Sequence, residues 1–275
     1  MINKLGVSII MPSLNEEDNV LAAITDTLQA VEDFEINGEI IVINDGSTDR
    51  TEGLVKEVML RDPRVRLINH STPQGIGASF WDGVKHAGGE IVTMLPGDNE
   101  NDPWETLQYY KLLEHVDIVI PFVFNREVRS LFRNALSYLY RFIINTTFLV
   151  NFNYTNGTIL YRKSILDELP VGSTGFFFQT DILIRSVKRG YLFAEVPYRL
   201  NMRKTGKSKA VSFPSLMKVT NGYLNLLKDI YFRNKNARSK PYAKGSLTAE
   251  RTGNESGHMR TQGKSSTDST EIISG

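Results

Sequence analysis

The sequence of 275 residues contains no cysteine. A disulfide framework is therefore excluded, and the composition fits a reducing compartment. Long hydrophobic runs are also missing: no stretch of about 18 or more uncharged apolar residues occurs, so we expect no transmembrane helix. We expect no signal peptide either, because the apolar run at residues 7–11 is interrupted by Pro12 and followed by acidic residues at positions 16–18.

Strong charge of one sign is absent, as are the common glycine motifs for phosphate binding. The formal net charge is +1, which does not indicate nucleic-acid binding. Neither Gly-x-x-x-x-Gly-Lys nor a Gly-x-Gly-x-x-Gly after the first predicted strand occurs. Basic residues are nevertheless clustered: residues 121–141 hold four arginines against one glutamate, and residues 198–209 hold five cations and no acid. These segments indicate a ligand that carries phosphate, an anionic membrane surface, or ordinary solvated surface.

The residues that are present describe a globular protein, because 41% are hydrophobic and 10% are aromatic. Short apolar runs rich in β-branched residues alternate with helical patterns, which predicts an α/β fold with a mostly parallel sheet. The predicted strands cover residues 7–11, 39–44, 65–69, 91–95, 117–121, 156–161 and 191–196. Polar turns follow the first four strands. They should meet at one edge of the sheet, where α/β proteins bind ligands.

Two later segments have helical patterns with large apolar faces. Residues 131–150 fit a core helix and a helix in the membrane interface equally well. Residues 213–232 carry an apolar stripe that would pack on the body or touch a membrane. The polar composition after residue 233 predicts disorder. We therefore expect a domain at 1–210, an amphipathic helix at 211–233 and a disordered polar tail at 234–275.

An acidic turn follows the predicted strand at 91–95. Asp98, Glu100 and Asp102 lie within five residues, directly after Pro96-Gly97. Asp102 fits the N-cap of a helix that begins with Pro103. Asp98 and Glu100 remain as candidate oxygen ligands for Mg²⁺ or Mn²⁺, which would in turn hold a diphosphate. The alternative is an acidic turn without metal.

These motifs, taken in order, resemble glycosyltransferase family 2, and within it the branch of dolichyl-phosphate mannosyltransferases and polyprenyl-phosphate sugar transferases. The resemblance rests on residues 7–17, 42–49, 97–100, 190–198 and 203–209. It implies a GT-A fold, a nucleotide-diphosphate sugar donor and an inverting transfer to a polyprenyl phosphate. It also implies a peripheral enzyme of cell-envelope glycan biosynthesis on the cytoplasmic face of a membrane.

The same resemblance implies roles for individual residues. On the donor side, Pro12, Leu14 and Glu16 would line the base and ribose pocket, and Asp45 would contact the nucleoside. The alternative is local: a helix cap for Asn15 and a turn beginning at Asp45. The diphosphate would face Arg203, Ser208 and Lys209. The acceptor would be bound by Arg126 and Arg129, and the candidate base is Asp181.

Departures from the family pattern leave other functions open. Relatives carry Asp-x-Asp where this chain has Pro96-Gly97-Asp98, so Glu100 would replace the lost charge around the metal. A phosphate acceptor needs no general base, whereas a hydroxyl acceptor would need Asp181 to take its proton. The alternative reading of Asp181 is an ordinary acid in the first turn of a helix. A third possibility is a catalytically weak protein that binds nucleotide sugars. The oligomeric state is not indicated.

Overall fold

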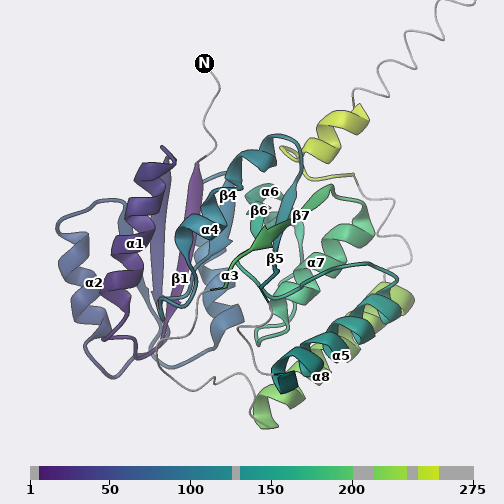
Figure 1. Cartoon of the computed structure of the whole chain (residues 1–275), viewed down its shortest axis with the longest axis horizontal. Coiled ribbons are helices and arrows are strands. Elements are labelled where there is room, and N and C mark those ends of the chain that lie inside the picture. Colours follow the sequence, from purple (N-terminus) through teal and green to yellow (C-terminus); the bar gives the residue numbers. More distant parts are fainter. Residues whose placement is uncertain (1–5, 126–130, 201–212, 234–240, 254–275) are drawn as a thin grey trace, which may run out of the picture.

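A seven-stranded sheet in the order β3-β2-β1-β4-β6-β5-β7 organises the chain. The computed structural model describes residues 6–125, 131–200, 213–233 and 241–253 (Figure 1). Within these residues only β6 runs antiparallel to its neighbours, β4 and β5, which confirms the predicted α/β fold with a mostly parallel sheet. The strands are β1 (Val7–Ser13), β2 (Gly38–Asn44), β3 (Val65–Asn69), β4 (Ile91–Met94), β5 (Ile118–Val123), β6 (Leu160–Arg162) and β7 (Phe193–Tyr198).

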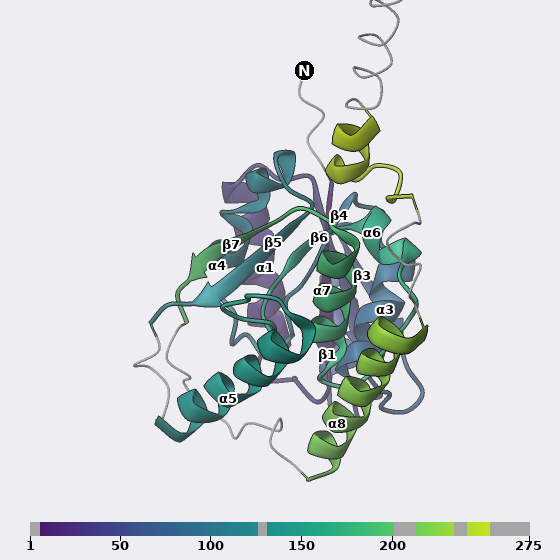
Figure 2. The same cartoon turned by 90° about the vertical axis from the view of Figure 1, so that its right-hand side faces the viewer.

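Helices cover both faces of the sheet (Figures 1 and 2). The central strands are therefore apolar on both faces: in β2, Ile40 and Val42 enter one core while Ile41 and Ile43 enter the other. One core receives α1 (Val20–Asp33), α2 (Thr51–Met59), α4 (Pro103–Leu107) and the 3₁₀ helix η1 (Tyr110–Glu114). The other receives α3 (Ile76–His86), α5 (Leu131–Phe148), α6 (Lys163–Glu168), α7 (Phe178–Arg189) and α8 (Phe213–Lys228), which continues as the π-helical turn η3 (Asp229–Arg233).

Helix α1 begins later than the acidic residues at 16–18 suggest. No acidic residue lies in its first turn. The preceding residues are instead held by the loop after β2, because the backbone N–H of Glu16 donates to Thr51 Oγ1 at 2.9 Å and that of Glu17 donates to Asp49 Oδ2 at 3.0 Å. This loop lies beside residues 14–17 because β1 and β2 pair in parallel.

Helix α5 is attached to the body by a narrow face. Among its described side chains, only Ile144 and Phe148 are buried, whereas Phe132, Leu139 and Phe142 are more than half exposed. Helix α8 contacts the carboxyl end of α5, where the hydroxyls of Thr147 and Tyr223 lie 2.9 Å apart, and exposes Leu216 and Met217. Figures 1 and 2 show both helices on the same side of the molecule. Within the described residues, no helix combines the length and the hydropathy needed to cross a bilayer.

The segment 241–253 differs from the expected disordered tail. It folds back onto the amino end of β5, and residues 247–253 are helical. The fully buried carboxylate of Asp117 holds it, accepting from the backbone N–H of Leu247 at 2.7 Å and from both the backbone N–H and the hydroxyl of Thr248. Composition does not predict this segment because tertiary contacts hold it: besides the bonds to Asp117, the backbone N–H of Ala243 donates to the Tyr191 hydroxyl at 2.9 Å. The other residues of the predicted tail, 234–240 and 254–275, lie outside the described residues.

Candidate active site

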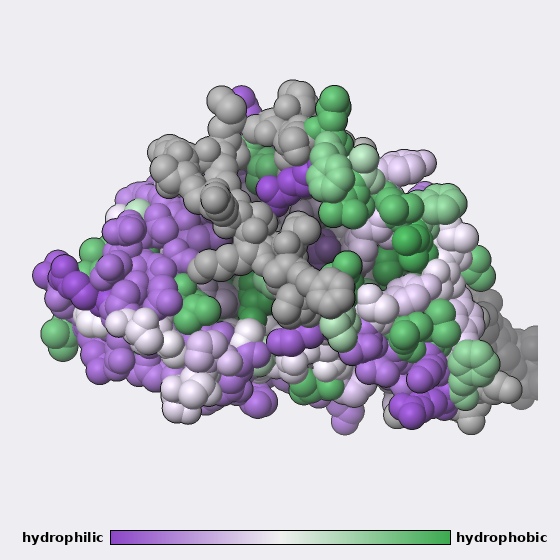
Figure 3. Space-filling view, turned by 90° about the horizontal axis from the view of Figure 1, so that it is seen from below, coloured by the Kyte–Doolittle hydropathy of each residue, from purple (hydrophilic) through white to green (hydrophobic). Residues whose placement is uncertain are grey.

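The candidate site residues follow parallel strands whose carboxyl ends meet at one edge of the sheet. Ser13, Asn44, Met94 and Tyr198 end β1, β2, β4 and β7, and the parallel pairings place all four ends at this edge. Antiparallel β6 begins at the same edge. Figure 3 views the molecule from this side. The topology therefore brings the loops after β1 and β2, the acidic turn after β4 and the end of β7 to one surface, as expected for an α/β ligand site.

The loop after β1 is fixed by the loop after β2. Asn15 has φ of 55°, a left-handed conformation that asparagine adopts more readily than most residues. Its backbone N–H donates to Ser47 Oγ at 3.0 Å, and its Oδ1 accepts from the backbone N–H of Thr48 at 2.9 Å. Leu14 and Glu16, on either side, are half-buried at the edge of the sheet. Pro12 is buried inside β1, and its carbonyl accepts from the N–H of Gly97 at 3.0 Å.

Asp45 is buried, and its carboxylate organises the turn that leads into α3. Its Oδ1 accepts from the backbone N–H of Gln74 at 2.8 Å, and its Oδ2 accepts from that of Gly75 at 2.8 Å. Gly75 has φ of 101°, which only glycine adopts readily. The predicted local turn at Asp45 is supported separately, because Gly46 has φ of 74° and the backbone N–H of Ser47 donates to Asn44 Oδ1 at 3.2 Å. Any contact of Asp45 with a nucleoside would be additional to its bonds with residues 74 and 75.

His70 lies between two carboxylates next to this turn. Its Nδ1 is 2.7 Å from Asp45 Oδ1 and its Nε2 is 3.0 Å from Asp82 Oδ2. Burial by itself disfavours the charged ring, but the hydrogen bonds and negative charges of Asp45 and Asp82 outweigh it and raise the pKa of His70. Both ring nitrogens thus face a carboxylate oxygen, an arrangement that favours the protonated ring, in which both nitrogens can donate. No local sequence pattern points to His70, because Asp45, His70 and Asp82 are brought together by β2, β3 and α3.

The acidic turn after β4 contains one capping residue and two candidate metal ligands. Asp102 caps α4 as predicted, accepting from the backbone N–H of Trp104 at 2.9 Å. Asp98 Oδ1 accepts from the backbone N–H of Glu100 at 3.1 Å, so the two candidate ligands share one tight turn. In the part of the chain that the structure describes, no group of three or more His, Asp or Glu side chains is arranged to hold a metal.

The two carboxylates are compatible with a hard divalent ion even so. Mg²⁺ is usually bound through one or two protein carboxylates, with water and substrate phosphates supplying its remaining ligands. Gly97 allows this turn to approach the end of β1, because a Cβ at this position would lie 2.2 Å from Ser13 Oγ. Asp98 and Glu100 match, in number and chemistry, the protein's share of such a site, but they do not form a closed metal cage.

Asp181 is buried in the first turn of α7, close to the same edge. Its Oδ1 accepts from Arg185 Nε at 3.0 Å, and the neighbouring Gln179 donates to the carbonyl of Gly157 at 2.6 Å just before β6. Burial raises the pKa of Asp181, although the charge and hydrogen bond of Arg185 lower it. The carboxylate is thus ion-paired, which gives the first-turn reading structural support.

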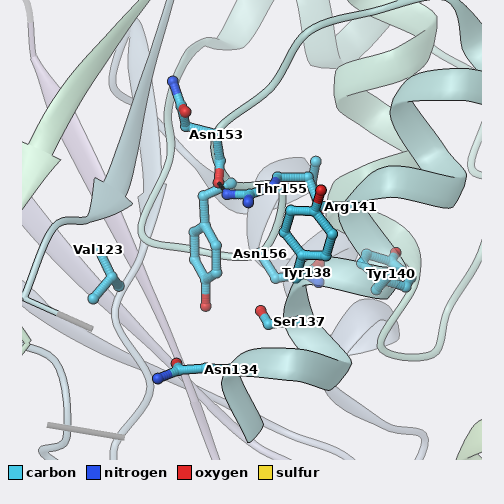
Figure 4. A pocket seen from close by; sticks show the side chains of 10 residues that line it. Val123, Asn134, Ser137, Tyr138, Tyr140, Arg141, Asn153, Thr155 and Asn156 are labelled. Atoms are coloured by element: carbon cyan, nitrogen blue, oxygen red, sulfur yellow. Dashed lines mark hydrogen bonds between the residues drawn. The ribbon is translucent and has the colours of Figure 1, made fainter. Parts of the chain in front are cut away.

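A polar cavity of about 120 Å³ lies between α5 and the loop 153–156, at the end of β5 (Figure 4). Helix α5 contributes Asn134, Ser137, Tyr138 and Arg141. Arg141 Nη1 donates to the carbonyl of Asn153 at 2.9 Å, so it joins the two walls. Residues 134, 137, 138 and 141 follow helical spacing. This helical spacing is present in the sequence, but it was not among the features that pointed to Arg126 and Arg129.

Several predicted site residues cannot be placed. Arg126 and Arg129, expected at the acceptor, and Arg203, Ser208 and Lys209, expected at the diphosphate, lie outside the described residues. Their roles remain predictions. The described neighbours locate the segments to which they are attached: residue 125 follows the end of β5 beside the cavity, and residue 200 follows the end of β7 beside the acidic turn.

Comparison with known proteins identifies the class. The sequence profile of the family described as Glycosyl transferase family 2 matches residues 8–170, and the chain belongs to this family. It is thus a glycosyltransferase. The chain is 28% identical over 221 residues to the polyprenol monophosphomannose synthase of Mycolicibacterium smegmatis, covering 73% of this chain and 79% of that protein. It is 32% identical over 113 residues to a dolichyl-phosphate beta-glucosyltransferase of Trichomonas vaginalis, covering 38% of this chain and 34% of that protein.

Solved structures confirm the GT-A-like fold. Glucosyl-3-phosphoglycerate synthase from Mycobacterium tuberculosis in complex with UDP aligns with a TM-score of 0.61 at 19% identity, covering 82% of this chain and 80% of that chain. The same enzyme in complex with Mn²⁺, UDP and glucosyl-3-phosphoglycerate aligns with a TM-score of 0.59 at 20% identity, covering 81% of this chain and 80% of that chain.

Proposed function

We propose that the protein transfers a sugar from a nucleotide diphosphate to a polyprenyl phosphate, with inversion at the anomeric carbon and with a divalent cation. The named relatives that act on polyprenol or dolichyl phosphate support this substrate class. The UDP complexes of the structural relative support a nucleotide-sugar donor, and its Mn²⁺ complex supports a metal.

The observation that carries the proposal is the two-sided character of α5. Asn134, Ser137 and Arg141 line the polar cavity at the end of β5. The opposite stripe of the same helix exposes apolar side chains, and Figure 3 shows hydrophobic residues gathered on the side where α5 and α8 lie. A polyprenyl phosphate has the same division, because an anionic headgroup adjoins a long apolar chain. The cavity would take the phosphate, with Arg126 and Arg129 nearby, and the apolar stripe would rest on the membrane.

On the donor side, we propose that Leu14, Glu16 and Asp45 surround the nucleoside above the buried Pro12. Arg203, Ser208 and Lys209 would face the diphosphate. A Mg²⁺ or Mn²⁺ ion held by Asp98 and Glu100 would supply positive charge next to the leaving group. In the transfer, an oxygen of the acceptor phosphate bonds to the anomeric carbon. The bond from that carbon to the diphosphate oxygen breaks, and its electron pair leaves with the nucleoside diphosphate.

This reaction places no demand on Asp181 as a base, because a phosphate monoester is already anionic near neutral pH. Transfer to a hydroxyl would require a base, and the buried ion pair of Asp181 with Arg185 argues against a free one. We accordingly propose a peripheral enzyme at the cytoplasmic face of a membrane, acting in the synthesis of cell-envelope glycans. The apolar faces of α5 and α8 would make the membrane contact.

The full chain, with vesicles that contain polyprenyl phosphate, tests this proposal. A panel of GDP-, UDP- and dTDP-sugars is offered with Mn²⁺, with Mg²⁺ or with chelator, and the lipid-linked sugar is measured. We expect one donor to give product only with the cation. If product forms only with a saccharide acceptor, and Asp181→Asn abolishes its formation, the acceptor is a hydroxyl group and not a lipid phosphate. Metal-independent donor binding without turnover would instead identify a binding protein, as Pro96 in place of the usual acid allows.

A further inference from the structure

A chain of ion pairs, centred on a buried arginine, connects η3 to α7. Arg185 of α7 is 8% exposed and bridges two carboxylates: its Nε is 3.0 Å from Asp181 Oδ1, and its Nη2 is 2.8 Å from Asp229 Oδ2 in η3, directly after α8. Arg233 also approaches Asp229, at 3.5 Å, but its side chain is 75% exposed. Arg185, unlike Arg233, is therefore shielded from water, and removing a carboxylate partner leaves its buried charge less compensated.

Asp181 in turn holds residues 172–177, which we call the strap. The backbone N–H of Ser173 donates to the Asp181 carboxylate. Gly172 packs directly against it, because a Cβ at this position would lie 1.8 Å from Asp181 Oδ2. Helix α8 contacts the strap from its own side: a Cβ on Gly222 would lie 2.8 Å from a ring carbon of Phe177.

The far side of the strap lies against the turn that opens α3. A Cβ on Gly77 would lie 2.5 Å from the carbonyl oxygen of Thr174, so no side chain fits between strap and turn. Residues 74 and 75 of this turn donate their backbone N–H groups to Asp45. A continuous set of contacts therefore runs from Asp229 through Arg185, Asp181 and the strap to the carboxylate on the donor side of the site.

We propose that Arg185 and Asp229 are positioning residues for donor binding: they fix Asp181 and the strap, and the strap fixes the turn at 74–77. This inference rests on the proposed function for its ligand, a nucleoside diphosphate, but the contacts exist without it. The position of α8 and η3 thereby becomes part of the donor site, although neither element supplies a residue to it.

Asp229→Asn in the full chain is the primary test, with Arg233→Gln as the matched control and Asp229→Glu as the conservative rescue. The first readout is amide hydrogen exchange without ligand. We expect exchange to rise about tenfold in the strap and in residues 74–77 of Asp229→Asn, equivalent to ~1.4 kcal/mol, and to stay unchanged in β1 and β2. Arg233→Gln and Asp229→Glu should match the wild type. Unchanged exchange in the strap, or an increase spread uniformly over the protein, would overturn the proposal.

Nucleotide binding gives the second readout, from thermal shifts with GDP, UDP and dTDP in the presence of Mn²⁺. Gly77→Ala separates strap from turn without touching a charge, and Gly53→Ala is its control because a Cβ there meets nothing within 4 Å. We expect Asp229→Asn and Gly77→Ala to weaken nucleotide binding about tenfold and Gly53→Ala to leave it unchanged. Wild-type binding in both variants would overturn the proposal. A wild type that binds none of the nucleotides would instead contradict the proposed function, and the exchange experiment would then decide the inference alone.

Discussion

The hydroxyl of Tyr198 accepts a hydrogen bond of 3.1 Å from the backbone N–H of Asp102. Tyr198 ends β7 and Asp102 ends the acidic turn, so the bond joins the end of the turn that carries the predicted cation ligands to the strand that precedes the predicted basic segment. The adjacent backbone N–H of Arg199 donates to Glu105 Oε2 at 2.9 Å and reinforces the junction.

Tyr198→Phe should loosen this junction with little change in packing. The N–H of Asp102, a half-buried residue, would lose a hydrogen bond that contributes about 0.5–1.5 kcal/mol. We expect a lower denaturation midpoint in urea and a larger fractional loss of donor turnover than of acceptor binding. A variant with wild-type turnover would show that the junction does not contribute to the site.

Asp98→Asn should remove the cation response. Neutralising one of two candidate carboxylate ligands weakens a hard-ion site, so the thermal shift produced by Mn²⁺ plus nucleotide should fall to that of nucleotide alone. Glu100→Gln should give a partial loss. Asp102→Asn is the matched control because Asp102 caps α4 and asparagine caps a helix as well as aspartate does, so both the stability and the metal response should stay close to those of the wild type. Equal metal responses in Asp98→Asn and the wild type would exclude Asp98 as a ligand.

His70 should make stability depend on pH in a defined direction. Its pKa is raised in the folded protein, so its ion pairs with Asp45 and Asp82 contribute fully below the unfolded value of about 6.5 and are lost as pH rises through the folded value. The difference in unfolding free energy between the wild type and His70→Gln should therefore shrink as pH increases from about 5.5 to above the folded pKa. Urea titrations of both proteins measure it. A difference that grows with pH would contradict the assignment of a charged ring.

Arg141→Gln should affect the acceptor more than the donor. The guanidinium lines the cavity and donates to the carbonyl of Asn153. If the cavity binds the acceptor phosphate, the loss of one charged hydrogen bond should raise the acceptor KM by about tenfold or more, with the donor KM unchanged. Phe142→Ser on the exposed stripe of α5 is the companion variant. It should reduce vesicle binding and leave transfer to a short-chain acceptor intact. A donor KM that rises with the acceptor KM in Arg141→Gln would indicate damage to the whole edge.

Much of the fold could be predicted because the central strands are fully buried. Residues 40–43 of β2 are β-branched throughout, and such a run has few alternatives. The limits of elements were harder where distant contacts set them. The backbone at Glu16 is held by Thr51, and β6 is only three residues long and depends on two neighbours for its antiparallel pairing.

The site was predictable only in part for the same reason. The N-cap at Asp102 is a local pattern, and so is the spacing of Asp181 and Arg185 on one helix. The pairing of Arg185 with Asp229 spans 44 residues, and the bridge from His70 to Asp45 spans 25. No local periodicity encodes such contacts, so they required the three-dimensional arrangement.

The anchoring of residues 241–253 on Asp117 changes where a minimal enzyme must stop. A boundary drawn after α8, where composition turns polar, would delete the donors of Leu247 and Thr248. The buried carboxylate of Asp117 would then keep Arg162, at 3.6 Å, and the backbone N–H of Leu192 as partners. A hydrogen bond to a charged group typically contributes about 1.5–3 kcal/mol, a large share of a domain's stability. Expression trials with shortened versions should accordingly keep the chain through Gly253, and we expect the yield of soluble protein to fall when the chain is cut at residue 240.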